Sequence, residues 1–224
     1  MKLVIFDCDG TLVDSQAMII ASLTRAFESR SLPPPPREAM LSIVGLSLIN
    51  AMRKLAPGES GQSQEALADA YKEAFWAFRD ARAHEEPLFP GARSALDWLH
   101  SHPSVKLGIA TGKSRRGVDR LLETHGLEGR FVTIQTADSA PSKPDPAMIL
   151  NALAEADVGP ENAVMIGDAS YDLDMAHAAG VAGIGVSWGF MPASVLQACR
   201  PRALIDDFNQ LQGVLETIWP ELAA

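Results

Sequence analysis

The sequence has no run of about 18 uninterrupted apolar residues, the length that a membrane-spanning helix needs. The apolar start, Met1 to Phe6, meets Asp7 and Asp9 before it could form the hydrophobic region of a signal peptide. These absences favour a soluble, cytoplasmic protein with no membrane partner.

Cysteine and clustered positive charge are also scarce. Only Cys8 and Cys199 occur, far apart, so neither a disulfide framework nor a thiolate zinc site is expected, and a reducing compartment fits. Basic residues form no dense block beyond Arg115 and Arg116, and the formal net charge is −9. This argues against a nucleic-acid partner. A chain this acidic must concentrate positive charge locally in order to bind an anion.

The composition is that of a globular protein. Apolar residues make up 47% and charged residues 21% of the 224 positions, which excludes a disordered chain of low hydrophobicity. The length suits one core domain with room for a smaller appendage. The sequence does not reveal the oligomeric state, and a monomer is compatible with it.

Strand and helix signals alternate from about residue 88 onward. Continuous apolar runs, typical of strands covered on both faces, occur at 2–6, 105–110, 131–135, 163–167 and 181–186, with a shorter one at 203–205. Amphipathic helical segments lie at 92–100, 115–125, 146–156 and 171–179. This pattern predicts an α/β fold: a parallel sheet with helices on both faces and a ligand site at the carboxyl ends of the strands.

Residues 16–86 interrupt the alternation and read as a helical insert. Pro33 to Pro36 form a stiff connector and Pro57 to Ser63 a loop. We interpret the apolar stripe of this segment as packing rather than a cofactor surface; it comprises Leu67, Ala70, Tyr71, Ala74, Phe75 and Phe78. The chain is therefore expected to divide into a core of residues 1–15 and 87–224 and an insert of residues 16–86.

Two aspartates follow the first strand directly, in Asp7-Cys8-Asp9-Gly10-Thr11. Side chains two positions apart leave a strand on the same side, so both carboxylates can face one ligand. Paired carboxylates divide naturally into a nucleophile and an acid/base, while Gly10 permits a close backbone approach. A plain Asp-Gly turn is the alternative. An EF-hand is excluded because that register puts Ile5 and Gln16 at the positions that need carboxylates.

A second acidic cluster, Asp168 with Asp172, follows the 163–167 strand. Asp172 would lie in the first turn of a helix, where capping is the alternative explanation. If both lie close to Asp7, the carboxylates offer a hard-cation site with several waters, which suits Mg²⁺ bridging a phosphate.

Two strand ends carry donors for such an anion. Thr111 opens a loop before a helix, and Lys143 lies between a serine and a proline in a constrained loop. A solvated surface charge is the alternative for Lys143 and is the reading we adopt for Lys113.

The order of these motifs resembles the haloacid dehalogenase superfamily, in particular its phosphoglycolate phosphatase-like branch. The resemblance covers nearly the whole chain, from Phe6–Ser15 through Phe89-Pro90-Gly91 and Ile109–Lys113 to Ser142–Pro146 and Ile166–Asp172. It implies a Rossmann-like core of strand order 5-4-1-2-3 with a helical cap inserted after the first strand.

The resemblance also implies roles for individual residues. Asp7 would be the nucleophile that forms an aspartyl-phosphate, and Asp9 the acid and then the base. Asp7, the Asp9 carbonyl and Asp168 would hold Mg²⁺, with Asp172 supporting the site directly or through a neighbour. Thr111 and Lys143 would be catalytic groups that bind the phosphoryl group. Backbone at Gly10 and Gly112 would add contacts, although many relatives have asparagine in place of Gly112.

The expected activity is Mg²⁺-dependent hydrolysis of a small phosphomonoester, with 2-phosphoglycolate as a candidate by resemblance alone. A sugar phosphomutase with the same intermediate is the alternative, followed by a non-catalytic binding protein. Asp9 disfavours carbon–halogen chemistry, and the lysines at 54 and 72 lie in no phosphonatase-type motif. Within the insert, Ile43–Ser47 resembles a substrate-facing loop in which Gly45 allows close approach, a simple turn between helices being the alternative.

Overall fold

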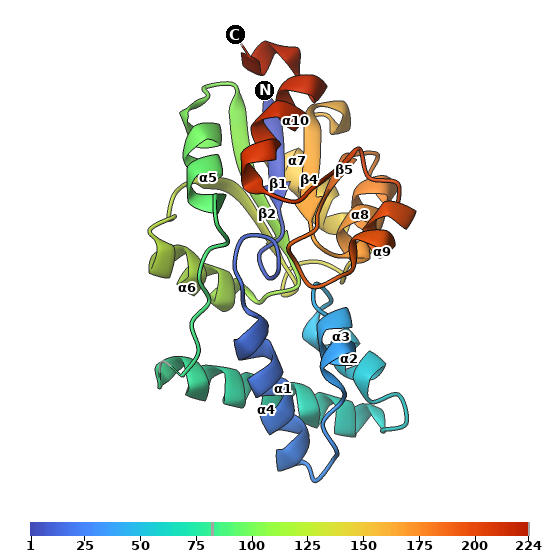
Figure 1. Ribbon diagram of the computed structural model, residues 1–224. Coiled ribbons are helices and arrows are strands. Elements are labelled where there is room, and N and C mark those ends of the chain that lie inside the picture. The colour runs from blue at the N-terminus through green and yellow to red at the C-terminus, as the bar shows by residue number, and fades with distance from the viewer. Residues whose placement is uncertain (82, 224) are drawn as a thin grey trace.

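The computed structural model describes residues 1–81 and 83–223. Its centre is a parallel six-stranded sheet in the order β3-β2-β1-β4-β5-β6 (Figure 1). The strands are β1 (Lys2–Phe6), β2 (Val105–Thr111), β3 (Phe131–Thr136), β4 (Ala163–Gly167), β5 (Ala182–Val186) and β6 (Ala203–Ile205). The expected α/β core and its strand order 5-4-1-2-3 are confirmed, and β6 extends the sheet beyond β5.

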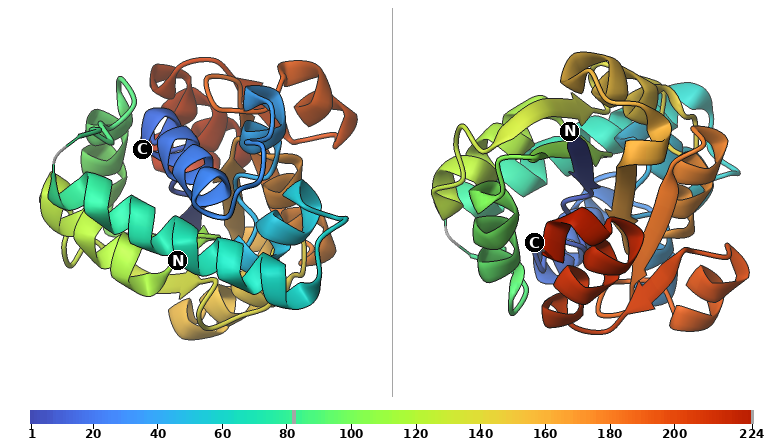
Figure 2. Two further views of the ribbon diagram at one scale, coloured as in Figure 1. Left: turned by 90° about the horizontal axis from the view of Figure 1, so that it is seen from below. Right: turned by 90° about the horizontal axis from the view of Figure 1, so that it is seen from above.

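Helices cover both faces of this sheet (Figure 2). They are α5 (Ala92–Ser101), α6 (Arg115–His125), α7 (Ala147–Ala156), α8 (Ser170–Ala178), α9 (Ala193–Ala198) and α10 (Leu211–Ile218), with 3₁₀ turns η1 (Pro160–Asn162), η2 (Phe208–Gln210) and η3 (Pro220–Ala223). Helix α6 begins at Arg115, as the 115–125 segment predicts. The Ser114 side chain accepts a hydrogen bond from Gly117 N at 3.2 Å and caps the first turn.

Alternation along β1 explains the two apolar layers. Val4 and Phe6 belong to the cluster beneath α5, α6 and α10, whereas Leu3 and Ile5 belong to the cluster beneath α7 and α8. All four side chains are fully buried. A strand covered on both faces has no need of polar residues, which is why β1 is continuously apolar up to Asp7.

The helices of residues 16–80 gather at the carboxyl end of the sheet, below it in Figure 1. They are α1 (Gln16–Ser29), α2 (Arg37–Ser42), α3 (Leu48–Leu55) and α4 (Gly61–Asp80). Helix α4 begins two residues before the end of the expected 57–63 loop, because Ser60 caps it. These helices have an apolar cluster of their own, which includes Leu23, Met52 and Leu67 and is joined by Phe190 from the loop after β5. We refer to α1–α4 as the insert.

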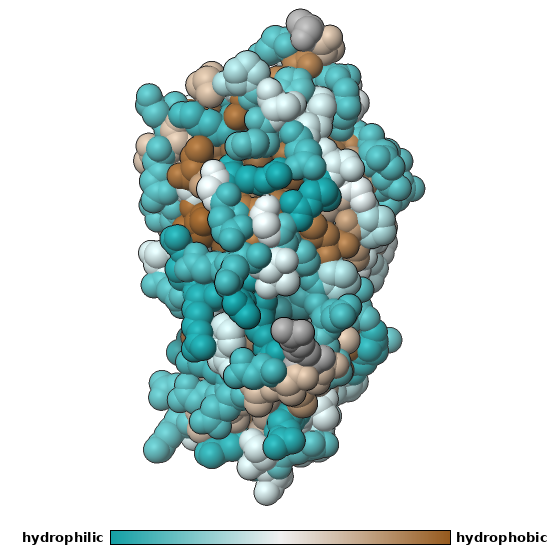
Figure 3. Space-filling model, turned by 90° about the vertical axis from the view of Figure 1, so that its left-hand side faces the viewer, coloured by the Kyte–Doolittle hydropathy of each residue, from teal (hydrophilic) through white to brown (hydrophobic). Residues whose placement is uncertain are grey.

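Polar contacts line the junction between the insert and the core. The face seen in Figure 3 carries a hydrophilic belt between the two parts, whereas hydrophobic patches lie mainly over the core above it. The Arg116 guanidinium of α6 lies 3.8 Å from the centre of the Trp76 ring of α4.

Among the described residues, no helix is both long and apolar enough to cross a membrane.

Candidate active site

The carboxyl ends of β1 and β4 bring three buried carboxylates together. Asp7, Asp168 and Asp172 each offer an oxygen within 4.8 Å of the others, and none is more than 2% exposed. Asp7 directly follows β1, while Asp168 follows β4 and Asp172 lies in the first turn of α8. The expectation that these three side chains lie close together is confirmed.

Asp7 is the least restrained of the three. Its backbone N–H donates to Ile166 O at 3.0 Å, which joins the end of β1 to β4. Lys143 Nζ lies 3.0 Å from Asp7 Oδ1, although the approach does not have hydrogen-bond geometry, and both carboxylate oxygens lack a hydrogen-bond partner among the described residues. A buried carboxylate with free oxygens can bind a cation or attack an electrophile.

Asp168 and Asp172 are fixed by their neighbours. Asp168 accepts hydrogen bonds from the Thr11 hydroxyl at 3.0 Å and from Phe190 N at 2.8 Å. Asp172 accepts from Lys143 Nζ at 2.5 Å and from Ala169 N at 3.1 Å. The capping alternative for Asp172 is therefore also correct, because one carboxylate oxygen caps α8 while the other binds Lys143.

Lys143 is buried and not a surface charge. It lies in the loop between β3 and α7, is 1% exposed, and reaches both Asp7 and Asp172. Burial disfavours the charged amine, but the carboxylates of Asp172 and Asp7 outweigh this effect and hold the pKa of Lys143 above its ordinary value. Lys143 is therefore positively charged in the site.

The carboxylates carry more negative charge than this lysine balances. Burial raises the pKa of Asp168 well above its ordinary value, and the nearby Asp172 and Asp7 add to the effect. Burial also raises the pKa of Asp172, to about 6, although the Lys143 ammonium opposes the shift. A divalent cation relieves this kind of repulsion, and the oxygen-only donors suit Mg²⁺. The residues present therefore fit the expected metal.

Glycine at position 10 is required by the backbone and by space. Its φ is +84°, and a Cβ there would lie 2.3 Å from Asp168 Oδ2. Gly10 N donates to Val13 O at 2.9 Å, which turns the chain toward the insert. The alternative of a plain Asp-Gly turn is therefore also present, because Gly10 forms the turn and its backbone lies directly against the Asp168 carboxylate.

The end of β2 provides the other wall of the site. Thr111 is 1% exposed, and its hydroxyl accepts a hydrogen bond from Lys113 N at 3.3 Å. At Gly112 a Cβ would lie 2.5 Å from Leu46 O and 2.6 Å from Gly45 O. The absence of a side chain at Gly112 therefore lets the insert loop lie against the core.

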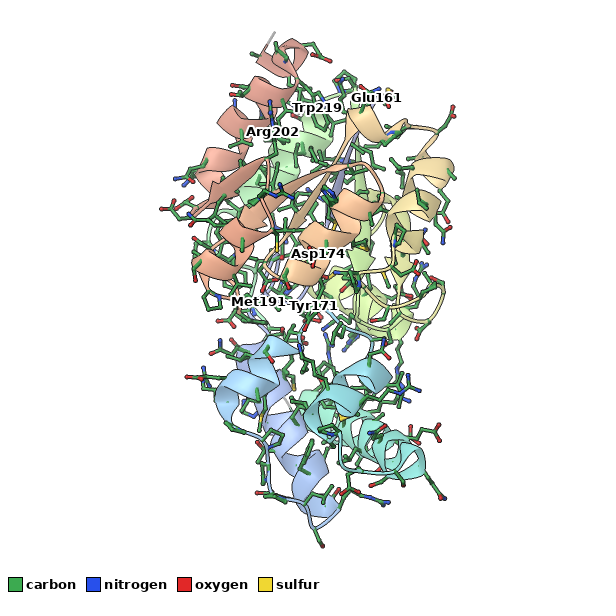
Figure 4. The ribbon with its side chains drawn as sticks, turned by 90° about the vertical axis from the view of Figure 1, so that its right-hand side faces the viewer. Glu161, Tyr171, Asp174, Met191, Arg202 and Trp219 are labelled. Carbon is green, nitrogen blue, oxygen red and sulfur yellow. The ribbon has the colours of Figure 1, made fainter. Side chains whose placement is uncertain are left out.

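This insert loop runs between α2 and α3, so it is a turn between helices and also faces the core. Gly45 has φ +99°, and Ser47 N donates to Ser142 Oγ at 2.8 Å, next to Lys143. From α8, the Tyr171 hydroxyl donates to Ser42 O at 3.0 Å and accepts from Lys54 Nζ at 2.5 Å. Figure 4 shows Tyr171 at the end of the core that faces the insert, close to Met191.

One interpretation was wrong: Lys113 is not a surface charge. Its side chain is 8% exposed, and its Nζ lies 2.8 Å from Asp9 Oδ1 and 3.2 Å from Glu86 Oε1. Burial opposes the charge, but Asp9 and Glu86 outweigh it and raise the pKa of Lys113. The signal was available, because Lys113 is two positions after Thr111 at a strand end, the same spacing as Asp7 and Asp9. No motif pointed to Glu86.

The Asp9 carboxylate therefore points to Lys113 and lies outside the cluster formed by Asp7, Asp168 and Asp172. Its side chain is 13% exposed. In this arrangement only the backbone carbonyl of Asp9 is available for the expected contribution to a metal site. The carboxylate remains free of that site and is available for proton transfer.

Comparisons with known proteins agree with this geometry. A family model described as haloacid dehalogenase-like hydrolase matches residues 4–186. A phosphoglycolate phosphatase from Pseudomonas putida is 34% identical over 216 residues, covering 94% of this chain and 78% of the relative. A haloacid dehalogenase-like hydrolase structure from Streptococcus pneumoniae superposes with a TM-score of 0.83 at 25% identity, covering 96% of this chain and 98% of that one.

A β-phosphoglucomutase candidate from Bacteroides vulgatus has the same fold, with a TM-score of 0.82 at 24% identity over 100% of this chain and 91% of that one. The family resemblance expected from the motifs is thus confirmed by sequence, by fold and by the arrangement of the carboxylates: the chain belongs to the haloacid dehalogenase-like hydrolases.

Proposed function

We propose that the protein hydrolyses small phosphomonoesters in a Mg²⁺-dependent reaction, through an aspartyl-phosphate on Asp7. The observation that carries the proposal is the Asp7 carboxylate itself. It is buried, has no hydrogen-bond partner among the described residues, and lies close to the Lys143 ammonium and to two further carboxylates. Phosphatases among the relatives support the reaction class. By the same likeness, 2-phosphoglycolate is the first substrate to try.

In the first step an Asp7 oxygen attacks phosphorus, and the bond from phosphorus to the leaving oxygen breaks. Asp9 donates a proton to that oxygen, so the product leaves as an alcohol. Lys143 stabilises the negative charge on the transferring group, and Thr111 supplies its hydroxyl and the N–H groups of the following loop. Gly10, Gly112 and Gly45 allow backbone to lie close to the substrate.

In the second step a water oxygen attacks phosphorus and the bond to Asp7 breaks. Asp9, now ionised, accepts the water proton, and inorganic phosphate is released. Asp7, Asp168, Asp172 and the Asp9 carbonyl would hold Mg²⁺, which neutralises phosphoryl charge when bound. Lys143 keeps Asp7 aimed at the phosphoryl group throughout.

We further propose that residues 1–15 and 87–224 act as the catalytic core and residues 16–86 as a substrate-selecting cap. The close contact of Gly45 and Leu46 with Gly112, beside Thr111, supports this division. A cap over the site would exclude bulk water during phosphoryl transfer and restrict the substrate to a small ester.

A sugar phosphomutase is the second candidate, because a mutase candidate shares the fold and would use the same intermediate. The two differ in the acceptor in the second step, which is water for a phosphatase and a sugar hydroxyl for a mutase.

The test is phosphate release from a panel of small phosphomonoesters, including 2-phosphoglycolate and β-glucose 1-phosphate, with Mg²⁺ or with a chelator. Asp7→Asn serves as the blank, because the amide is a poor nucleophile of nearly the same shape. Mg²⁺-dependent release that is absent in the blank supports the phosphatase. Sugar-phosphate isomerisation without net release would instead support the mutase, and equal release by Asp7→Asn would refute Asp7 as the nucleophile.

A further inference from the structure

Lys113 lies between two carboxylates where the insert meets the core. Its Nζ is 2.8 and 3.1 Å from the two Asp9 oxygens and 3.2 Å from Glu86 Oε1. The Lys113, Asp9 and Glu86 side chains are only 8%, 13% and 7% exposed. Both Asp9 oxygens face the ammonium, so the lysine fixes the orientation of this carboxylate as well as its charge.

The insert holds the lysine in place from the other side. Glu86 Oε2 lies 3.2 Å from Arg79 Nη1 of α4. The Phe75 ring, one turn earlier on the same helix, has its centre 5.4 Å from Lys113 Nζ. A chain of ion pairs thus runs from α4 through Glu86 and Lys113 to Asp9. The Asp9 carboxylate is therefore connected to α4 through two further side chains.

The orientation of Asp9 matters in the second half of the proposed reaction. After the alcohol has left, the Asp9 carboxylate must face the water that attacks the aspartyl-phosphate in order to accept its proton. The two contacts from Lys113 Nζ to the Asp9 oxygens fix that orientation. Glu86 also binds the ammonium, so Asp9 is not the sole counter-ion of Lys113.

We propose that Lys113 is a positioning residue that holds the Asp9 carboxylate in place for hydrolysis of the aspartyl-phosphate, and that Glu86 and Arg79 connect this function to the docked insert. The inference rests on the proposed function. In the step concerned, the water O–H bond breaks as its proton passes to Asp9, the new oxygen–phosphorus bond forms, and the bond to Asp7 breaks. Lys113 exchanges no atom in this step.

The test is Lys113→Met, assayed with p-nitrophenyl phosphate and Mg²⁺. Nitrophenolate leaves readily without a proton, so formation of the intermediate is spared while its hydrolysis is slowed. We expect kcat to fall about 10- to 100-fold and KM to fall with it, leaving kcat/KM within about threefold of the wild type. A rapid burst of nitrophenolate, approaching about one per active site, should precede the slow steady state.

Lys72→Met is the matched control, because Lys72 is an exposed lysine of α4 whose ion pair with Asp69 lies in solvent. It should keep the wild-type kcat and show no burst. Glu86→Gln removes the ion pair with Arg79 while keeping Lys113 and Asp9. It should lower kcat and KM together and give a burst, each to a smaller extent than Lys113→Met. If Lys113→Met does not fold, as judged by its thermal transition, Glu86→Gln decides the question.

An unchanged kcat without a burst would overturn the role of Lys113. A parallel loss of kcat and kcat/KM without a burst would do the same, since it would reveal general damage to the site. Absence of Mg²⁺-dependent turnover in the wild type would instead overturn the proposed function, so the two failures are distinguishable.

Discussion

Two buried charge clusters lie on either side of the motif that follows β1, and they differ in charge balance. The pocket cluster contains Asp7, Asp168 and Asp172 with one lysine, Lys143, so three negative charges meet one positive charge. The junction cluster contains Asp9, Glu86, Lys113 and Arg79, so two negative charges meet two positive charges.

This difference in balance indicates what each cluster can do. The pocket has excess negative charge, which is why burial and mutual repulsion raise the pKa values of Asp168 and Asp172 and why a cation fits there. Among the residues that the structure describes, the junction has equal numbers of opposite charges that pair with one another, so it can hold groups in position without a ligand. Asp7 and Asp9 are only two residues apart, yet they belong to different clusters.

The largest expected effect comes from removing Lys143, the one cation that the described residues bring to the pocket. Lys143→Met should lower kcat/KM by about 100- to 1,000-fold, because the transferring phosphoryl group loses its ammonium and Asp7 its restraint. Steady-state phosphate release measures this. Lys72→Met controls for loss of a lysine elsewhere, and a loss below about tenfold would contradict the assigned role.

A smaller effect is expected where the insert loop meets the core. In Gly112→Ala the new Cβ would lie 2.5 Å from Leu46 O, so the loop must move away and we expect kcat/KM to fall about tenfold. Gly58→Ala is the matched control, because a Cβ there meets nothing within 4 Å. Equal activity of the two variants would show that close docking of the loop is not needed for turnover.

The imbalance of the pocket also predicts a pH-dependent effect of metal on stability. The raised pKa values mean that the folded, metal-free protein binds protons more tightly than the unfolded chain, so its stability falls as pH rises through about 6, the pKa of Asp172. Millimolar Mg²⁺ should therefore raise Tm by several degrees near pH 8 and by much less near pH 5, where protons replace the metal. Thermal scans at both values measure this, and an equal shift at both would contradict the prediction.

The smallest expected change in stability is a gain in Tm, and a loss of function accompanies it. Asp168→Asn removes one repelling charge while its amide can still bond Thr11 and Phe190, so the metal-free Tm should rise by about 2–4 °C. The same variant should lose the stabilisation by Mg²⁺ and most of its activity. Asp174→Asn, an exposed aspartate on the same helix as Asp172, should change neither. A lower metal-free Tm for Asp168→Asn would show that the pocket is not electrostatically strained.

Much of the pocket could be predicted from the sequence. Asp7, Asp168 and Asp172 each follow a buried strand of a parallel sheet. The strand order implied by the family resemblance makes β1 and β4 neighbours, as the structure confirms, so their carboxyl ends meet. The junction could not be predicted in this way. Lys113 and Asp9 are 104 residues apart, and Glu86 lies in a connecting segment with no periodic pattern. Tertiary contacts bring Glu86 to Lys113: the Glu86 carbonyl lies 2.9 Å from His125 Nε2 of α6, and its carboxylate pairs with Arg79 of α4.

The sequence by itself determined the succession of strands and helices along the chain, the helical character of residues 16–80 and the motif residues at the strand ends, because side-chain periodicity and chain direction are local properties. The order of the strands in the sheet was implied by the family resemblance. Tertiary structure decided what each charge faces. It turned Asp7 into the pocket and Asp9 toward Lys113, and it placed the insert loop over Gly112. Which distant side chains share a buried volume depends on how the layers pack, and no local pattern encodes that.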